Sequence, residues 1–376
     1  MDKVLTLRGG PELVAYWAQL GSLMELIAGV ALAGVGTGIS VLVAQTDDPA
    51  RQRALLREAV RLGLMVSAPV MIVGVALAIY FRREIGAGFE PPLILLAAAA
   101  GCIAVIPGML NGYWLGRQRR ALMLALVAVS ALLQLAAAAF APPARVLAAI
   151  ALAQAAPALA ALFAIGPATV TAESAHDRGL LRRYIGPGLV IGVLSPLSMM
   201  AARGMVSVGM SWHEAGLLQA LWRVSDWVAL VAGGVMAVQF LPRLSAAWRT
   251  DGFAAVLRRA ALVTLLPAAA AFAVLFVFQR PVFALLYDAS FRMSDTAVAL
   301  FFAGTLARIA SWLPLYALYA SRRTAPIMIG EFLSLPLFVA LLAAYPGTLS
   351  LEAAGAMWLA AYIAYGLFNL WMVRRA

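Results

Sequence analysis

The arginines of this chain constrain its fold most strongly, because nearly all of them lie in gaps between long apolar runs. The dense clusters occupy every second gap, and the intervening gaps are poor in arginine. The clusters are Arg51, Arg53, Arg57 and Arg61; Arg117, Arg119 and Arg120; Arg178, Arg182 and Arg183; Arg243, Arg249, Arg258 and Arg259; Arg322 and Arg323; and Arg374 and Arg375. Cytoplasmic loops of membrane proteins retain Lys and Arg, whereas short translocated loops do not. The pattern predicts a multi-pass membrane protein whose C-terminus is cytoplasmic.

Composition excludes a soluble domain. Hydrophobic residues make up 64% of the chain and charged residues 12%, and the apolar residues come in runs of roughly 20, the length that spans a bilayer. The net charge of +11 would suit nucleic acid if the basic residues shared one face. They lie instead at alternate helix ends, where anionic lipid headgroups attract them. We therefore expect the lipid bilayer as a partner and no nucleic acid.

The apolar runs predict an all-α polytopic membrane protein with about 11 transmembrane helices. The runs cover residues 14–42, 62–80, 92–115, 121–140 and 146–165 in the first half, and 185–210, 215–241, 253–278, 297–320, 326–345 and 352–372 in the second. The polar stretch between the halves predicts three parts: an N-terminal helical bundle (1–170), a cytoplasmic linker (171–183) and a C-terminal six-helix bundle (184–376). An odd number of spans would leave the N-terminus outside, yet Met1 to Leu7 lacks a signal-peptide core. We expect a further helix before Met1.

The two halves also repeat each other at an offset of 200 positions. Four residues of the first span recur in the span at 215–241: Ala15, Gln19, Gly34 and Val35 correspond to Ala215, Gln219, Gly234 and Val235. These spans become equivalent once a first helix is restored. Parallel repeats related by an axis along the membrane normal are a transporter architecture, with a central cavity at the repeat interface.

Ionisable residues inside the apolar runs are the candidate functional residues. A charge at the bilayer centre costs at least about 2.5 to 3.5 kcal/mol, so such residues need a partner, an aqueous cavity or a ligand. With a rise of about 1.5 Å per residue, two arginines lie roughly 12 to 14 Å below the outer boundary, and Glu331 lies about 9 Å from the cytoplasmic edge. The six residues are Arg203 and Arg223 at that depth, Glu25, Asp226 and Arg308 near mid-depth, and Glu331.

Two interpretations of these charges remain open. Three acids and three arginines could simply neutralise one another, and Arg223 with Asp226 at i, i+3 could pair on one helix face. Alternatively, guanidinium groups line an aqueous lumen and bind an acidic headgroup through bidentate bonds. The buried carboxylates Glu25, Asp226 and Glu331 would then carry the coupling proton or ion, or balance the charge.

Gln19 and Gln219 are added to the candidate substrate-binding residues because they share the repeat position. Amide side chains can bind sugar hydroxyls, although they also join helices within membranes.

Motifs for enzymatic chemistry are absent. The sequence has no Gly-rich loop ending in Lys-Ser or Lys-Thr, and Lys3 is its only lysine, so we expect no ATP hydrolysis. His176 and His213 lack Cys or paired carboxylates at ligand spacing, so we expect neither a metal nor a cofactor. Energy would come from a gradient or from mass action.

Several short motifs resemble Wzx-type flippases, the lipid III and O-antigen translocases of the multidrug/oligosaccharidyl-lipid/polysaccharide exporter superfamily. The motifs are Gly10-Pro11-Glu12, Trp17-Ala18-Gln19-Leu20, Gly34-Val35-Gly36-Thr37-Gly38, Glu214-Ala215-Gly216, Gln219 through Asp226, and Arg308 with Ser311-Trp312 and Glu331. The resemblance covers essentially the whole chain and is most specific at Gln219 to Asp226. The first transmembrane helix of that family has no counterpart in the sequence.

This resemblance implies two bundles that open alternately to each side of the bacterial inner membrane. The substrate would be undecaprenyl-pyrophosphate-linked oligosaccharide, moved from the cytoplasmic to the periplasmic leaflet for surface polysaccharide such as O-antigen. Cationic lumen residues of the family serve the anionic headgroup, a role that would fall to Arg203, Arg223 and Arg308. Polysaccharide polymerase and chain-length machinery are the implied partners.

Two other functions compete with this interpretation. A small-molecule or drug cation antiporter of the same fold would have a carboxylate-dominated pocket, whereas three arginines in the spans favour an anion. A membrane oligosaccharide polymerase or glycosyltransferase would have a long outside loop rich in Arg and acidic residues, or an Asp-rich nucleotide-sugar site. The longest outside loop, 278–296, carries only Arg280, Asp288, Arg292 and Asp295. We therefore expect a transporter and not an enzyme.

Overall fold

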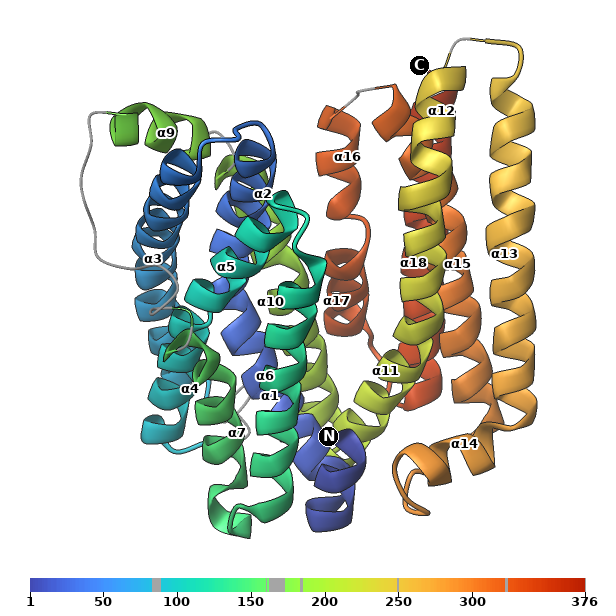
Figure 1. Ribbon diagram of the computed structural model, residues 1–376. Helices are drawn as coiled ribbons and strands as arrows, with labels where there is room; N and C mark the ends of the chain where they lie inside the picture. Colours follow the sequence, from blue (N-terminus) through green and yellow to red (C-terminus); the bar gives the residue numbers. More distant parts are fainter. Residues whose placement is uncertain are drawn as a thin grey trace. The chain divides into compact units, whose positions relative to one another are not determined.

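The computed structural model describes residues 1–82, 89–159, 161, 173–182, 185–248, 250–321 and 324–375, and every regular element in these ranges is a helix (Figure 1). The all-α fold predicted from the sequence is thereby confirmed. Arg183, Arg249, Arg322 and Arg323 of the arginine clusters, and residues 171, 172 and 183 of the predicted linker, lie outside the described ranges.

Nine helices within the described ranges are long and apolar enough to cross a membrane. They are Asp2–Ala44, Pro49–Tyr80, Pro91–Gly116, Arg120–Phe140, Trp212–Ala247, Phe253–Val277, Asp295–Ala320, Ala325–Ala344 and Leu351–Arg374. Each matches one of the predicted runs. The predicted run 146–165 is represented by a shorter apolar helix, Pro143–Leu159, and the run 185–210 by α10 (Ile185–Gly209). This is the organisation of a multi-pass membrane protein.

The chain divides into two compact units. The first contains Met1–Arg8 and Tyr16–Met200, and the second contains Gly9–Ala15 and Ala201–Ala376. The division between the units falls within α10, and the domain boundaries inferred from the sequence, 1–170, 171–183 and 184–376, stay predictions. Each unit is described below by itself.

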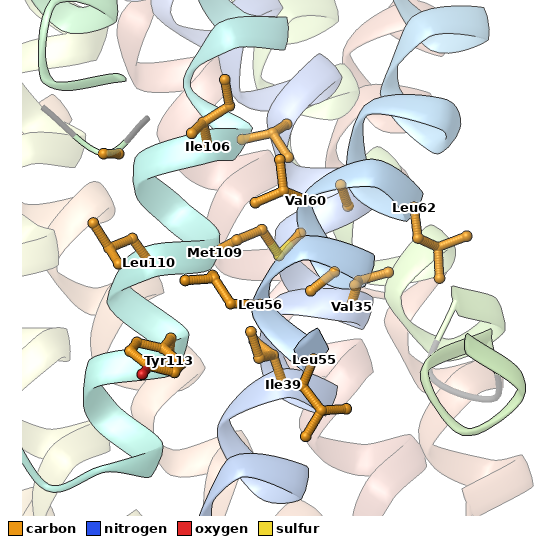
Figure 2. Close-up of a cluster of buried hydrophobic side chains, with 14 of the residues drawn as sticks. Val35, Ile39, Leu55, Leu56, Val60, Leu62, Ile106, Met109, Leu110 and Tyr113 are labelled. Atoms are coloured by element: carbon orange, nitrogen blue, oxygen red, sulfur yellow. The ribbon is translucent and has the colours of Figure 1, made fainter. Parts of the chain in front are cut away.

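The first unit is built from α1 (Asp2–Ala31), α2 (Thr37–Ala44), α3 (Pro49–Tyr80), α4 (Pro91–Ile103), α5 (Val105–Gly116), α6 (Arg120–Phe140), α7 (Val146–Ala155) and α9 (Glu173–Arg182). Its core lies where α3 and α5 pack on the end of the first span (Figure 2). Val35, Ile39, Leu55 and Met109 are each at most 1% exposed. Close approach depends on glycine, because a Cβ on Gly116 would lie 2.6 Å from the Ser40 carbonyl oxygen.

A kink interrupts α1 near its start. Gly9 and Gly10 have non-helical backbone angles, and Gly10 has φ of 62°, a conformation that favours glycine. Pro11 follows and cannot donate a backbone hydrogen bond. Before the kink, Arg8 donates to the Ala138 and Ala141 carbonyl oxygens at the C-terminal end of α6, where a cation complements the helix dipole.

The second unit is built from α11 (Trp212–Val235), α12 (Leu241–Ala247), α13 (Phe253–Val277), α14 (Gln279–Leu286), α15 (Asp295–Ala320), α16 (Thr324–Glu331), α17 (Leu335–Ala344) and α18 (Leu351–Arg374). α15 packs along α18 (Figure 1). Serine side chains cap three of these helices: the Ser211, Ser294 and Ser350 hydroxyls accept from backbone N–H groups in the first turns of α11, α15 and α18. Such caps satisfy N–H groups that have no intrahelical partner.

Both units contain a long helix with the same interruption. A π-helical segment, Leu32–Gly36, joins α1 to α2, and a second, Met236–Phe240, joins α11 to α12. Ala15 and Ala215 are both fully buried, and Gln19 and Gln219 are 2% and 6% exposed. The α–π–α pattern therefore occurs in the two helices that the sequence repeat relates.

The helix α9 is attached to α3 within the first unit. Arg178 donates to both carboxylate oxygens of Glu58, with Nε–Oε2 and Nη2–Oε1 distances of 2.8 and 3.0 Å. The Glu58 side chain is 9% exposed and that of Arg178 29%. Because the geometry is bidentate and the carboxylate is nearly buried, we interpret this ion pair as structural.

Replacing Glu58 with Gln is expected to loosen that attachment. The change leaves Arg178 without its anionic partner, and a modest loss of stability is expected, since the exposed side of the guanidinium stays solvated. The apparent melting temperature of the purified chain in detergent measures the loss. Asp47→Asn, at an exposed position just before α3, is the control and should leave the melting temperature unchanged. Equal melting curves for Glu58→Gln and wild type would show that the pair contributes nothing.

Candidate functional site

Five of the six ionisable residues predicted within spans belong to the second unit, and Glu25 on α1 belongs to the first. Arg203 lies on α10, Arg223 and Asp226 on α11, Arg308 on α15 and Glu331 at the end of α16. Burial differs among them: Arg203 is buried, Asp226, Arg308 and Glu331 are intermediate, and Arg223 and Glu25 are exposed. We take the charged residues of the second unit as the candidate site.

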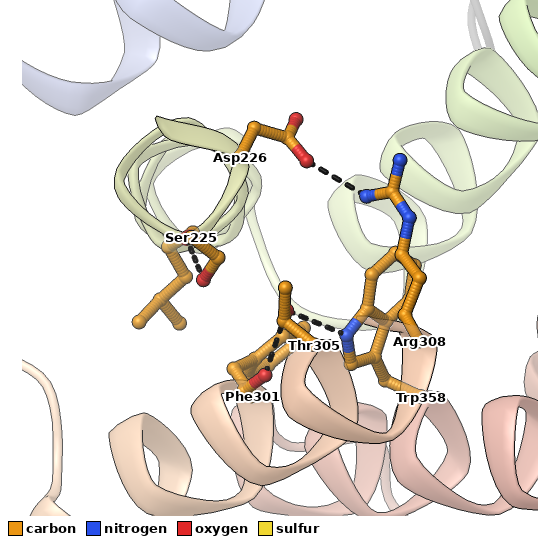
Figure 3. Close-up of polar contacts among 7 residues, drawn as sticks. Ser225, Asp226, Phe301, Thr305, Arg308 and Trp358 are labelled. Atoms are coloured by element: carbon orange, nitrogen blue, oxygen red, sulfur yellow. Dashed lines mark hydrogen bonds and ion pairs between the residues drawn. The ribbon is translucent and has the colours of Figure 1, made fainter. Parts of the chain in front are cut away.

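The centre of this site is an ion pair between two helices. Arg308 Nη1 donates to Asp226 Oδ1 at 2.7 Å, joining α15 to α11 (Figure 3). The Arg308 side chain is 27% exposed and the Asp226 side chain 43%. Asp226 therefore pairs with Arg308, which lies 82 positions away in the sequence. One interpretation of the sequence had paired Asp226 with Arg223 on the same helix.

Aromatic rings hold the same guanidinium. Its carbon lies 5.5 Å from the centre of the Trp312 ring and 5.8 Å from that of Tyr362, within the range of cation–π attraction. Trp312 is one helical turn after Arg308 on α15, and Tyr362 comes from α18. Nearby, Trp358 Nε1 on α18 donates to Thr305 Oγ1 on α15 at 3.3 Å, a hydrogen bond between these two helices (Figure 3). Two helices thus position Arg308 independently of Asp226.

An aromatic cluster supports this side of the second unit. Trp358 lies 5.3 Å from Phe338, 5.6 Å from Trp222 and 4.7 Å from Tyr362, measured between ring centres. Trp222 and Trp358 are each 2% exposed. Rings of this size contribute much of the buried area of a core and pack in defined orientations, so the cluster fixes where α18 presents Tyr362.

Arg203 and Gln219 form a second polar contact. Arg203 is 1% exposed, and its Nη1 donates to Gln219 Oε1 at 2.8 Å. Gln19, the repeat counterpart of Gln219, also contacts α10: its Nε2 donates to the Met200 carbonyl oxygen at 3.2 Å. Both glutamines thus join their own helix to α10, which is the helix-joining role weighed for them from the sequence.

Glu331 lies where its span is interrupted. α16 ends at Glu331, and α17 begins at Leu335. The Tyr365 hydroxyl donates to Glu331 Oε1 at 3.1 Å, and the Ser334 hydroxyl donates to the Glu331 carbonyl oxygen at 2.6 Å. Pro336, at the first turn of α17, is the sequence signal for an interruption of this span. Tyr362 and Tyr365 were missed, because aromatic residues are ordinary in a membrane helix.

The chemistry available in the second unit is ionic recognition. A guanidinium with accessible N–H groups can bind phosphate oxygens in pairs, which an ammonium group cannot. Within the described ranges, no group of three or more His, Cys, Asp or Glu side chains is placed to hold a metal ion.

Comparisons with known proteins relate the chain to transporters by fold. No sequence-family model and no curated protein sequence matches it. The chain is similar to the inward-facing structure of a multidrug resistance MATE family transporter of the MOP superfamily, with a TM-score of 0.82 and 14% identity over 100% of this chain and 92% of that one. It is also similar to the lipid II flippase MurJ in an inward closed conformation, with a TM-score of 0.72 and 14% identity over 99% and 84%.

A third similar structure is a MOP superfamily transporter from Pyrococcus furiosus, with a TM-score of 0.65 and 14% identity over 99% of this chain and 89% of that one. At such low identity, these likenesses show a shared fold. The chain has the fold of MOP superfamily transporters, a group whose structures include both drug exporters and a lipid flippase.

Proposed function

We propose that this protein is a transporter that flips an anionic lipid-linked oligosaccharide across the bacterial inner membrane by alternating access. The observation that carries the proposal is Arg308, a guanidinium near the middle of a span, held by two aromatic rings and bonded to Asp226 through one nitrogen. Phosphate groups are the ligands best matched to such a side chain. The similarity of fold to the lipid II flippase MurJ supports a lipid substrate.

The finer assignment follows the resemblance of the sequence motifs. The substrate is undecaprenyl-pyrophosphate-linked oligosaccharide for surface polysaccharide of the O-antigen type, moved from the cytoplasmic to the periplasmic leaflet, with the C-terminus in the cytoplasm. Arg308 serves the pyrophosphate together with Arg223, and Arg203 supports this role through its bond to Gln219. Gln219 and Gln19 act by joining their helices to α10. Glu25, Asp226 and Glu331 balance charge or couple transport to an ion or a proton. Polymerase and chain-length proteins consume the product.

A reconstitution experiment tests this proposal. Proteoliposomes that contain the purified chain receive a fluorescent undecaprenyl-pyrophosphate-linked oligosaccharide in one set and a cationic dye in another. Movement of the lipid between leaflets, followed by quenching with a membrane-impermeant reagent, is expected only with the protein present. Transport of the dye without any movement of the lipid would instead support the cation antiporter.

The cation antiporter is the second candidate because two carboxylates, Asp226 and Glu331, accompany the arginines in the second unit and the fold is shared with drug exporters. Its substrate would be a cation that binds a carboxylate, and the positive charge of Arg308 would oppose that binding. The two sets of liposomes therefore separate the candidates directly.

A further inference from the structure

Two arginine–carboxylate pairs of this protein differ in design. Arg178 and Glu58 make two bonds, and the carboxylate side chain is 9% exposed. Arg308 and Asp226 make one bond, and the carboxylate side chain is 43% exposed. The two arginines are about equally exposed, at 29% for Arg178 and 27% for Arg308. The Arg178 pair resists exchange of partners because two bonds must break and a nearly buried carboxylate would be left without its counter-charge. A single bond to an accessible carboxylate can be exchanged at far lower cost.

Arg308 has contacts other than its bond to Asp226. Trp312 and Tyr362 contact the guanidinium from α15 and α18, and Asp226 approaches from α11. In Figure 3 the remaining guanidinium nitrogens point away from Asp226. If Asp226 withdrew, the cation would keep its two aromatic contacts and its orientation.

Membrane depth explains why a carboxylate should stand here at all. A bare guanidinium at mid-span is unfavourable, so Arg308 requires an anion whenever no ligand is bound. Asp226 supplies that charge. A pyrophosphate supplies more negative charge and can bond to two guanidinium nitrogens at once, so it can take over the role of the carboxylate.

We propose that Asp226 is a resident counter-ion of Arg308, which pairs with the guanidinium in the empty transporter and gives it up to the phosphate of the arriving substrate. The inference rests on the proposed function, in which Arg308 binds the lipid headgroup. Competition by Asp226 lowers substrate affinity and speeds release, because the carboxylate reclaims the arginine as the phosphate departs.

Binding of farnesyl pyrophosphate to the full chain in detergent tests the inference, with farnesol as the uncharged control ligand. Asp226→Asn removes the competing charge and is expected to tighten binding of farnesyl pyrophosphate about tenfold, as a charge-assisted bond of 1.5 kcal/mol or more would give. Asp226→Glu keeps the competing charge, so its affinity should stay well below that of Asp226→Asn. Asp251→Asn, at an exposed turn of the same unit, is the matched control and should bind like wild type.

Translocation in proteoliposomes supplies a second measurement. Tighter binding without a competing carboxylate slows release, so Asp226→Asn should flip the fluorescent lipid several-fold more slowly at saturating substrate, while Asp226→Glu retains most of the rate. The gain in affinity must disappear in the Arg308→Ala background, because the counter-ion then has no cation to release. A melting temperature for each variant verifies that the chain is folded.

The outcomes separate this inference from the proposed function. If Arg308→Ala loses binding of farnesyl pyrophosphate but Asp226→Asn binds no more tightly than wild type, the counter-ion role is rejected and the anion site stands. If neither wild type nor Asp226→Asn binds farnesyl pyrophosphate better than farnesol, both are rejected. If Asp226→Asn unfolds, unchanged binding by Asp226→Glu supports the inference, and a marked gain in its affinity overturns it.

Discussion

A chain carrying Arg308→Ala is expected to reach the membrane in normal amount and to lose translocation of the lipid-linked substrate. The guanidinium is the group that would bind the phosphates, and alanine removes it together with both cation–π contacts. Loss of a charge-assisted bond at a partly desolvated site costs about 1.5 to 3 kcal/mol, which is about 10- to 100-fold in affinity. The proteoliposome assay measures translocation, and rescue of surface glycan in a strain lacking its flippase measures it in cells.

Arg280→Ala is the matched control, since Arg280 is an exposed arginine on α14 in the same unit. It should translocate lipid at the wild-type rate. The double variant Arg308→Ala/Asp226→Ala should fold as well as the single variant and be equally inactive, which excludes an unpaired Asp226 as the cause. Arg308→Lys retains the charge but not the planar donor pair and should restore only a small part of the rate. Full activity of Arg308→Ala would remove the basis of the proposed function.

Gly216→Ala is expected to be the most damaging small substitution in the second unit. A Cβ on Gly216 would lie 2.1 Å from the Pro11 carbonyl oxygen and 2.4 Å from the Pro11 carbonyl carbon. Both are backbone atoms, so the clash cannot be relieved by a side-chain rotation. The helices must separate where α11 crosses the chain after the Gly9–Gly10 kink, and overpacking of this kind costs about 1 to 3 kcal/mol or more. The apparent melting temperature and the yield of monodisperse protein should both fall sharply.

Gly234→Ala on the same helix is the control for that result. A Cβ at Gly234 meets no atom within 4 Å, and alanine favours helix over glycine by about 0.5 to 1 kcal/mol. Gly234→Ala should therefore match or exceed the melting temperature of wild type. If Gly216→Ala melted as late as Gly234→Ala, the close crossing would contribute nothing to stability.

The fold could be predicted from the sequence because the bilayer imposes it. Runs of apolar residues indicate where helices of spanning length lie, and the structure places its long helices on those runs. The break between Glu331 and Leu335 is not visible in the apolar content, which is the same on both sides, and Pro336 is its one signal in the sequence.

The candidate residues could be predicted as a set, but their pairing could not. Charge is costly in a membrane, so Arg308 and Asp226 can be identified as candidates from their positions within apolar runs. Their bond joins α15 to α11 across 82 positions, and no local spacing encodes it, whereas the i, i+3 relation of Arg223 to Asp226 is visible in the sequence. The spacing of Arg308 to Trp312, one helical turn, was the available signal for the cation–π contact.

The two π-helical segments decide which residues of the following helix face inward. A π turn holds one residue more than an α turn, and each residue advances an α-helix by 100°, since 3.6 residues complete a turn. Everything beyond Gly36 is thereby rotated relative to an uninterrupted helix, and in this phase Ile39 and Val43 are buried in the packed core. Deleting one residue from Leu32–Gly36 would turn every later side chain of this helix by about 100°, and Ile39 and Val43 would leave the positions in which they now pack.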